Sequence, residues 1–165
     1  MACACGREWG FVSEGVDFCR LCFIDRFEGR VKKTLVDCVF TRGMKVLVVG
    51  ELAGYLFKKL VSVPVEVTYT GVVQPFDGMV IVERTLEDEC VAFLQRLGGD
   101  AVARDSSVSL FRLISEDDVI AYAQLKWISF VPFVKNEHWL KFLKSFDDHP
   151  EMKRNMLRMA GEIGQ

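Results

Sequence analysis

The spacing of hydrophobic residues along the chain predicts helices and strands in alternation. Residues 23–35 carry an apolar side chain at every fourth position, which predicts an amphipathic helix. Residues 44–49 form a largely β-branched apolar run that predicts a buried strand of a parallel sheet, and residues 52–60 continue with a helical pattern. Because a strand, a glycine and a helix in this order open the nucleotide-binding α/β folds, we expect an α/β domain built on a parallel sheet.

The rest of the chain continues this alternation. Strands are indicated by alternating or β-branched runs, and helices by one-sided apolar spacing, a serine that can cap a helix and a proline suited to a first turn. The patterns predict strands at residues 63–70, 78–82 and 101–103, and helices over residues 87–97, after Ser115 and from Pro150 onward. The apolar run at residues 127–133 fits a core strand and an exposed interface equally well.

Four of the six cysteines lie within the first 22 residues. Cys3 and Cys5 form one close pair, Cys19 and Cys22 form a second, and a glycine-containing stretch separates the pairs. Two thiolate pairs brought together by a hairpin supply the four tetrahedral ligands that zinc prefers. The sequence therefore predicts a small structural zinc knuckle, and the alternative is a remnant in which only one pair is still suited to a metal.

Length and charge limit the function classes that remain. The chain has 165 residues and a formal net charge of −2, which fits one domain plus an appendage and excludes attraction of nucleic acid by bulk charge. We expect a knuckle with its basic helix at residues 1–40 and an α/β domain at residues 41–165. No leader peptide or membrane span is predicted, so we expect a cytoplasmic protein.

A local basic patch is the remaining feature through which this chain could bind nucleic acid. Arg26, Arg30, Lys32 and Lys33 interleave with the apolar positions of the first predicted helix and give it a basic face. This face is a candidate for phosphate contacts, and the alternative is an ordinary solvated helix surface.

The loop after the first predicted strand does not fit a nucleotide site. Backbone N–H groups that bind phosphate need small neighbouring residues. This loop instead has Glu51 where an anion should sit, and the bulky Leu52 and Tyr55 follow it. The spacing of Gly50 and Gly54 is by itself a weak signal. We therefore predict a degenerate loop and no nucleotide binding.

No set of catalytic residues emerges from the sequence. His138 and His149 have no partner spaced as a second metal ligand or as a member of a hydrolytic triad. Cys90 lies beside acidic residues instead of the base or cation that would activate a thiol, so it is predicted to be a packed core cysteine. Cys38 is likewise a lone thiol among apolar residues.

Several segments, taken in order, resemble one known family. They are residues 17–23, 30–35, 43–48, 112–122, 142–146 and 149–157. Their succession of a cysteine pair, a basic helix, a Gly-x-Lys-Val-Leu strand and two closing helices is similar to the cytoplasmic tRNA 2-thiolation protein 2 family. The chain is shorter than is typical of that family, and the Ser-Gly-Gly-x-x-Ser loop of the wider PP-loop ATPase group is absent from residues 49–55.

The resemblance implies a PP-loop ATPase-like fold, Rossmann-like and of the HUP type, with helices flanking a parallel sheet. It also implies a cytosolic role in 2-thiolation of the wobble uridine of tRNAs, where ATP adenylates the uridine oxygen before a sulfur donor attacks. In that family the catalysis belongs to a homologous thiolase subunit, which pairs with the second protein as a heterodimer and receives sulfur through a ubiquitin-like carrier.

The combined prediction is a non-catalytic subunit that binds no ATP, pairs with the catalytic thiolase and contacts tRNA through Arg26, Arg30, Lys32 and Lys33. Two alternatives stay open. One is an active ATP-dependent tRNA thiolase with an unrecognised nucleotide loop. The other is a zinc-ribbon interaction module whose α/β body serves only as a scaffold.

Overall fold

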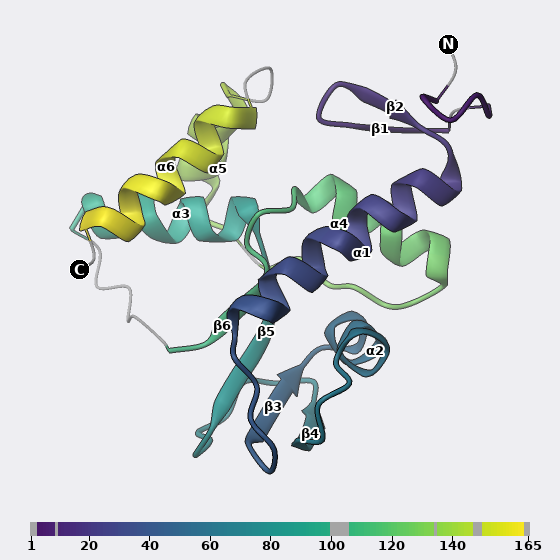
Figure 1. The fold of residues 1–165 in the computed structure, drawn as a ribbon. Coiled ribbons are helices and arrows are strands. Elements are labelled where there is room, and N and C mark those ends of the chain that lie inside the picture. Colours follow the sequence, from purple (N-terminus) through teal and green to yellow (C-terminus); the bar gives the residue numbers. More distant parts are fainter. Residues whose placement is uncertain (1–2, 9, 100–105, 134, 147–149, 164–165) are drawn as a thin grey trace.

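The computed structural model describes residues 3–8, 10–99, 106–133, 135–146 and 150–163. Within these ranges the chain forms a short hairpin, a larger sheet and six helices (Figure 1). The elements are β1 (Phe11–Ser13), β2 (Val16–Phe18), α1 (Arg20–Asp37), β3 (Lys45–Val49), α2 (Glu51–Leu60), β4 (Glu66–Thr70), β5 (Met79–Thr85), α3 (Leu86–Leu97), β6 (Val108–Phe111), α4 (Glu116–Lys126), α5 (Glu137–Lys144) and α6 (Pro150–Ile163).

The larger sheet has four parallel strands in the order β4-β3-β5-β6. Helices flank it, which confirms the predicted α/β fold class. The predicted strand at residues 101–103 lies outside the described residues, and β6 forms the sheet edge instead. The strand order reverses between β3 and β5, and in open α/β sheets the carboxyl ends of strands at such a point form the usual ligand crevice.

Strand β3 is buried on both faces, as its continuous apolar run predicts. Val46 and Val48 face the main core, whereas Leu47 and Val49 pack with Val82 of β5 in a smaller cluster. Successive side chains of a strand point to opposite faces, so the two clusters lie on opposite sides of the sheet. The main cluster contains side chains of α1, α2 and α4, and these three helices therefore cover one face.

Helix α1 confirms and extends the amphipathic helix predicted at residues 23–35. Its buried face joins the main core, where the Phe27 ring stacks on that of Tyr122 in α4 with centroids 4.1 Å apart. On the same helix Glu28 accepts hydrogen bonds of 2.6 Å from the Tyr122 hydroxyl and from Lys59 in α2. Helix α1 thus contacts both α2 and α4 across one face of the sheet. The domain division at residue 40 stays a prediction.

A second cluster holds the C-terminal helices together. Leu86, Cys90 and Leu94 of α3 pack with Leu143 of α5 and with apolar side chains of α6. In Figure 1 these helices form a group beside the sheet, away from α2. Helix α3 begins with a capping box, in which the hydroxyl of its N-cap residue Thr85 accepts the backbone N–H of Asp88.

The apolar run at residues 127–133 forms neither a strand nor a continuous exposed face. Ile128 and Phe130 pack against the main core, whereas Trp127 is 94% exposed and Val131 is also exposed. The backbone therefore turns alternate side chains inward and outward along an irregular segment.

None of the described helices is long and apolar enough to cross a membrane.

The contact between α1 and α4 predicts a large stability cost for Phe27→Ala. Removing the buried ring leaves a cavity beside Tyr122, so the free energy of unfolding should fall by about 3 to 5 kcal/mol. Urea unfolding followed by circular dichroism measures this change. Val36→Ala is the matched control, because Val36 lies on the same helix and is 68% exposed. Equal stability of the two variants would contradict the packing described here.

Candidate metal and anion sites

Four cysteine side chains meet where the N-terminal segment approaches the start of α1. Cys19 is the N-cap residue of α1, and Cys22 lies in its first turn. The β1–β2 hairpin returns the chain to Cys3 and Cys5, so the two pairs converge. Cys5 Sγ lies 3.5 Å from Cys3 Sγ and 3.6 Å from Cys19 Sγ. All four sulfurs lie within 4.8 Å of one another.

The four thiols differ in how readily they lose a proton. The backbone N–H of Cys22 lowers the pKa of Cys19 to about 6, because it donates to the thiolate. Backbone groups of Cys5 and Cys19 likewise lower the pKa of Cys3. Side-chain contacts with Cys5, Cys19 and Cys3 raise the pKa of Cys22 to about 12. A metal cation would favour ionisation of all four, since thiolates are the form that metals bind.

The donor set fits a single metal ion. Zn–S bonds of about 2.3 Å at tetrahedral angles place sulfurs about 3.8 Å apart, close to the separations in this cluster. Cys3 and Cys19 are buried, Cys22 is half-buried and Cys5 is exposed, so such a site would be partly open to solvent. The four predicted cysteines can therefore hold a metal.

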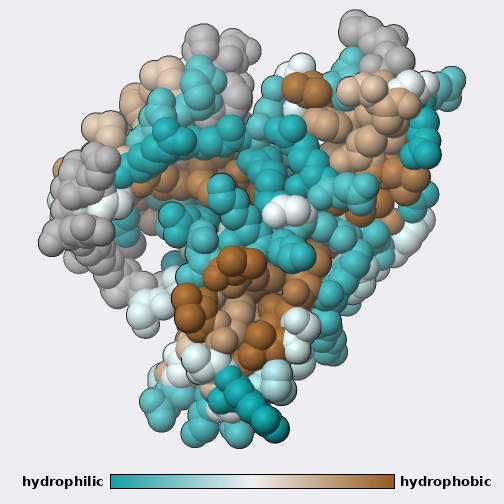
Figure 2. Space-filling view, viewed as in Figure 1, coloured by the Kyte–Doolittle hydropathy of each residue, from teal (hydrophilic) through white to brown (hydrophobic). Residues whose placement is uncertain are grey.

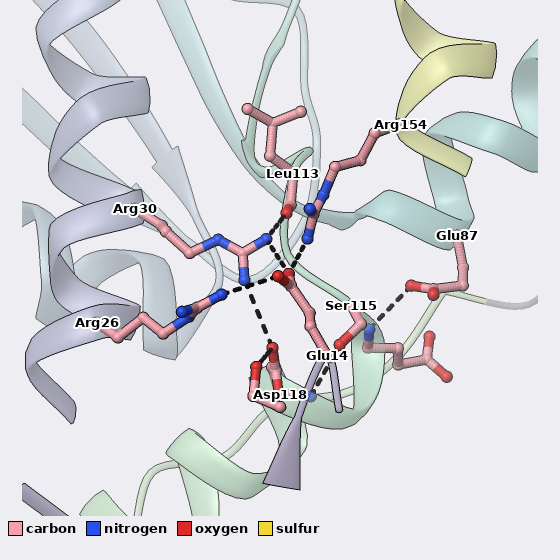
Figure 3. Close-up of polar contacts among 10 residues, drawn as sticks. Glu14, Arg26, Arg30, Glu87, Leu113, Ser115, Asp118 and Arg154 are labelled. Atoms are coloured by element: carbon pink, nitrogen blue, oxygen red, sulfur yellow. Dashed lines mark hydrogen bonds and ion pairs between the residues drawn. The ribbon is translucent and has the colours of Figure 1, made fainter. Parts of the chain in front are cut away.

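A single carboxylate, that of Glu14, gathers three arginines from two helices (Figure 3). Glu14 lies at the turn between β1 and β2. Arg26 Nη2 donates to Glu14 Oε2 at 2.8 Å, and Arg30 Nη2 lies 2.7 Å from Glu14 Oε1. Arg154 reaches the same carboxylate from α6. Arg30 also pairs with Asp118 at 3.6 Å. We call Arg26, Arg30 and Arg154 the arginine cluster.

A cleft of about 500 Å³ opens beside the arginine cluster. Six cationic side chains and one acidic side chain line it, which concentrates positive charge on a chain whose net charge is −2. Figure 2 shows that hydrophilic residues cover much of the middle of the molecule, where α1 crosses in Figure 1. The charged lining residues are Glu14, Arg26, Arg30, Lys33, Arg112, Arg154 and Arg158.

The four cations predicted to contact RNA have different surroundings. Arg26 and Arg30 pair with Glu14, so they form part of an internal ion-pair network as well as the cleft wall. Lys33 is exposed and lines the cleft, whereas Lys32 is exposed outside its lining. The structure therefore brings three of the four together at one opening, and their contact with RNA stays a prediction.

The side-chain carboxyl group of Glu83 fills the degenerate loop that follows β3, and the sequence patterns did not lead us to expect it there. Glu83 lies in β5, within a register irregularity between Val82 and Thr85, and its side chain reaches the start of α2. The backbone N–H of Ala53 donates to Glu83 Oε1 at 2.6 Å. A Cβ atom on Gly50 would lie 2.1 Å from the Glu83 carboxyl carbon, and Gly50 has a φ of 108°. The positive φ favours glycine here, and any larger residue would also have to displace the Glu83 side chain.

This geometry corrects the prediction for Glu51. Glu51 is exposed, and Glu83, which is 8% exposed, supplies the anion at the helix start. Burial raises the pKa of Glu83 to about 7, against the lowering effect of the backbone N–H groups of Ala53 and Leu52. Leu52 points into the main core and so does not fill the loop as predicted. The place where a phosphate would meet the backbone thus already holds an internal carboxylate.

A larger cavity, of about 700 Å³, lies at the starts of α3 and α4. Acidic side chains line most of its charged wall, among them Glu87 and Asp117. Ser115, the predicted N-cap residue, also lines it and accepts the backbone N–H of Asp118, which confirms that cap. Glu14 and Arg154 line both this cavity and the cationic cleft, so their ion pair lies where the two meet.

The remaining candidate residues show no catalytic arrangement among the described parts of the chain. Cys90 is fully buried, and burial raises its pKa to about 12, in keeping with a core thiol. Burial also raises the pKa of Cys38, which donates to a backbone carbonyl. His138 is exposed and its ring contacts Trp139. His149 lies outside the described residues.

The comparisons with known proteins give one informative result. No protein-family model matches the chain, and no curated protein matches it by sequence. Among solved structures, the fold resembles the U34-tRNA thiolase NcsA from Methanococcus maripaludis with its [4Fe-4S] cluster, with a TM-score of 0.71 and 13% identity. The match covers 98% of this chain and 87% of that chain. The likeness therefore concerns the fold over nearly the whole chain.

The cysteine cluster predicts one metal ion per chain. Cys19→Ser should lower metal content sharply, because a serine oxygen is a poor substitute for a thiolate ligand. Elemental analysis of protein purified without chelators, by mass spectrometry, measures the ratio for zinc and iron together. Cys38→Ser is the control, since Cys38 lies outside the cluster. Unchanged metal content in Cys19→Ser, or no metal in the unaltered protein, would contradict a metal site.

The raised pKa of Glu83 predicts a specific dependence of stability on pH. Between pH 4.5, its ordinary pKa, and about 7, the folded chain binds more protons at this carboxyl than the unfolded chain. Its contribution to the free energy of unfolding therefore falls with rising pH, by up to about 3 kcal/mol. Urea titrations of the unaltered protein and of Glu83→Gln should diverge across this window. Glu51→Gln, the exposed control, should follow the unaltered protein, and a constant difference for Glu83→Gln would contradict the assignment.

Proposed function

We propose that the chain is a non-catalytic subunit of a cytoplasmic tRNA thiolation complex, needed for 2-thiolation of the wobble uridine. The observation that carries the proposal is the likeness of fold to a U34-tRNA thiolase, which extends over 98% of the chain. The likeness of several ordered segments to the tRNA 2-thiolation protein 2 family supports the same role. Catalysis would then belong to a homologous thiolase partner that receives sulfur from a ubiquitin-like carrier.

The internal carboxylate at α2 supports the non-catalytic part of the proposal. ATP binding in α/β folds commonly uses backbone N–H groups at a helix start beside the strand-order reversal. Here Glu83 accepts the N–H of Ala53 at that position, and a phosphate would have to displace this buried carboxyl group from the same space. Binding of ATP by the isolated chain would instead favour the alternative of an active thiolase.

The cationic cleft supports the tRNA-binding part. RNA-binding proteins gain most of their affinity by neutralising backbone phosphates with lysine and arginine. Lys33, Arg112 and Arg158 line the cleft and are exposed, whereas the arginine cluster is partly buried. The cleft thereby extends the predicted patch on α1 to the end of β6 and to α6.

The cysteine cluster would serve a structural purpose in this role. We propose zinc as its metal, because the sulfur separations suit one tetrahedral ion. The ion would fix the β1–β2 hairpin to the start of α1, and so fix the position of Glu14 beside the cleft. A knuckle that binds metal without any effect on tRNA binding or thiolation would instead favour the alternative of a zinc-ribbon interaction module.

Reversing the exposed cations of the cleft tests the RNA-binding role. The triple variant Lys33→Glu, Arg112→Glu, Arg158→Glu should lower tRNA affinity by at least about tenfold and flatten its salt dependence, since phosphate contacts are lost. Fluorescence anisotropy with labelled tRNA over a salt series measures both, for the full chain with and without the thiolase partner.

The matched control reverses three exposed cations that do not line the cleft, Arg42, Lys45 and Lys141, for the same change in net charge. It should keep most of the affinity. An equal loss in both triple variants would mean that general charge, and not this cleft, attracts tRNA.

A further inference from the structure

The arginine cluster has the composition of a phosphate site. Arg26 and Arg30 approach Glu14 from α1, and Arg154 approaches from α6, so three guanidinium groups converge on one carboxylate (Figure 3). Guanidinium groups bind phosphate and carboxylate oxygens with the same paired geometry. A backbone phosphate and a carboxylate each present two terminal oxygens and one negative charge, so a phosphate can replace the Glu14 carboxylate in this arrangement.

The charge around Glu14 is unbalanced in favour of the cations. Asp118 pairs with Arg30 at 3.6 Å and is the second acid in contact with the cluster. Burial lowers the pKa of Arg30, and the charge of Arg26 adds to that effect. Burial also lowers the pKa of Arg154, with a further contribution from Arg158. Arg26 and Arg30 repel each other, as do Arg154 and Arg158, in a partly buried place, so an incoming anion would be stabilised there.

The cluster also holds an unused donor. The buried Arg26 Nε has no hydrogen-bond acceptor within the described part of the chain. A buried N–H group without an acceptor costs free energy, so a ligand with additional acceptor oxygens would improve this arrangement. A backbone phosphate has two ester oxygens in addition to two terminal oxygens that match those of the Glu14 carboxylate.

Glu14 can leave the cluster without unfolding the core. It lies at the tip of a hairpin with three-residue strands, and its side chain remains 16% exposed. It lines both the cleft and the larger cavity, so its side chain borders open space as well as the arginines. The arginines are anchored differently, since α1 packs in the main core and α6 packs on α3.

We propose that the arginine cluster binds one backbone phosphate of RNA, and that Glu14 occupies this phosphate site when RNA is absent. The proposal rests on the proposed function, since it names the group of RNA that the cleft recognises. RNA fits better than a free anion because Lys33, Arg112 and Arg158 continue the positive charge along a cleft of about 500 Å³, which exceeds the size of one phosphate. Glu14 then acts as an internal competitor that RNA must displace.

Removing the charge of Glu14 tests this competition. Glu14→Gln should bind tRNA about tenfold more tightly than the unaltered chain, the gain expected if Glu14 holds the site about nine-tenths of the time. Asp17→Asn is the control, because it removes one charge from the same hairpin and lies outside the cleft lining. Adding Arg154→Gln to Glu14→Gln should abolish the gain. Equal affinity of Glu14→Gln and the unaltered chain would overturn the proposal.

A second measurement needs no variant. The side-chain carboxyl carbon of Glu14, labelled with ¹³C, should change its NMR signal when RNA is added to the unaltered full chain. RNA that binds without moving this signal would overturn the competition while leaving the proposed RNA-binding function intact. Absence of any RNA binding would instead overturn the proposed function. Inorganic phosphate is the third arm: an equally large signal change at matched phosphate concentration would assign the site to a free anion and overturn its assignment to RNA.

Discussion

The packing of one face of α1 against the parallel sheet is the interaction on which the rest of the structure depends. Phe27 stacks on Tyr122, and the other buried side chains of α1 fill the main core. This burial directs the flank of the helix that carries Arg26 and Arg30 toward the cleft. It also fixes the N-terminus of α1, where Cys19 and three other cysteines form a cluster that can hold a metal. Core, cleft and knuckle are therefore positioned by one helix.

Two carboxyl groups that are buried or partly buried, those of Glu83 and Glu14, occupy positions where a ligand phosphate could otherwise bind. Charged groups leave water only when other groups compensate them. Glu83 is compensated by backbone N–H groups at α2, and it closes the place where this fold would meet phosphate. Glu14 is compensated by three arginines, which together carry more charge than it does. The first arrangement leaves no free space for a phosphate at the start of α2, and the second is the basis of the phosphate site proposed above.

Local pattern predicted much of this fold and only part of the sites. The spacing in α1, the apolar run of β3 and the cysteine pairs are signals within short segments, and the structure agrees with them. The contact between Glu14 and Arg154 joins residues 140 positions apart, and no local pattern reports it. Strand β6 was missed because its serine-containing sequence resembles a loop. The sequence did contain a signal for Glu83, because a charged residue directly follows the buried apolar residues of β5.

The most direct test is to deplete the protein in its own cells and measure 2-thiouridine in bulk tRNA, by its retardation on a mercury-containing gel. This measurement assumes neither a particular partner nor a particular metal. If the protein is a subunit of the thiolation complex, the retarded band should be lost on depletion. The band should return when the unaltered chain is re-expressed. An undiminished band after depletion would contradict the role in wobble-uridine thiolation, and would leave an α/β protein with a cysteine cluster and a cationic cleft whose ligand lies elsewhere.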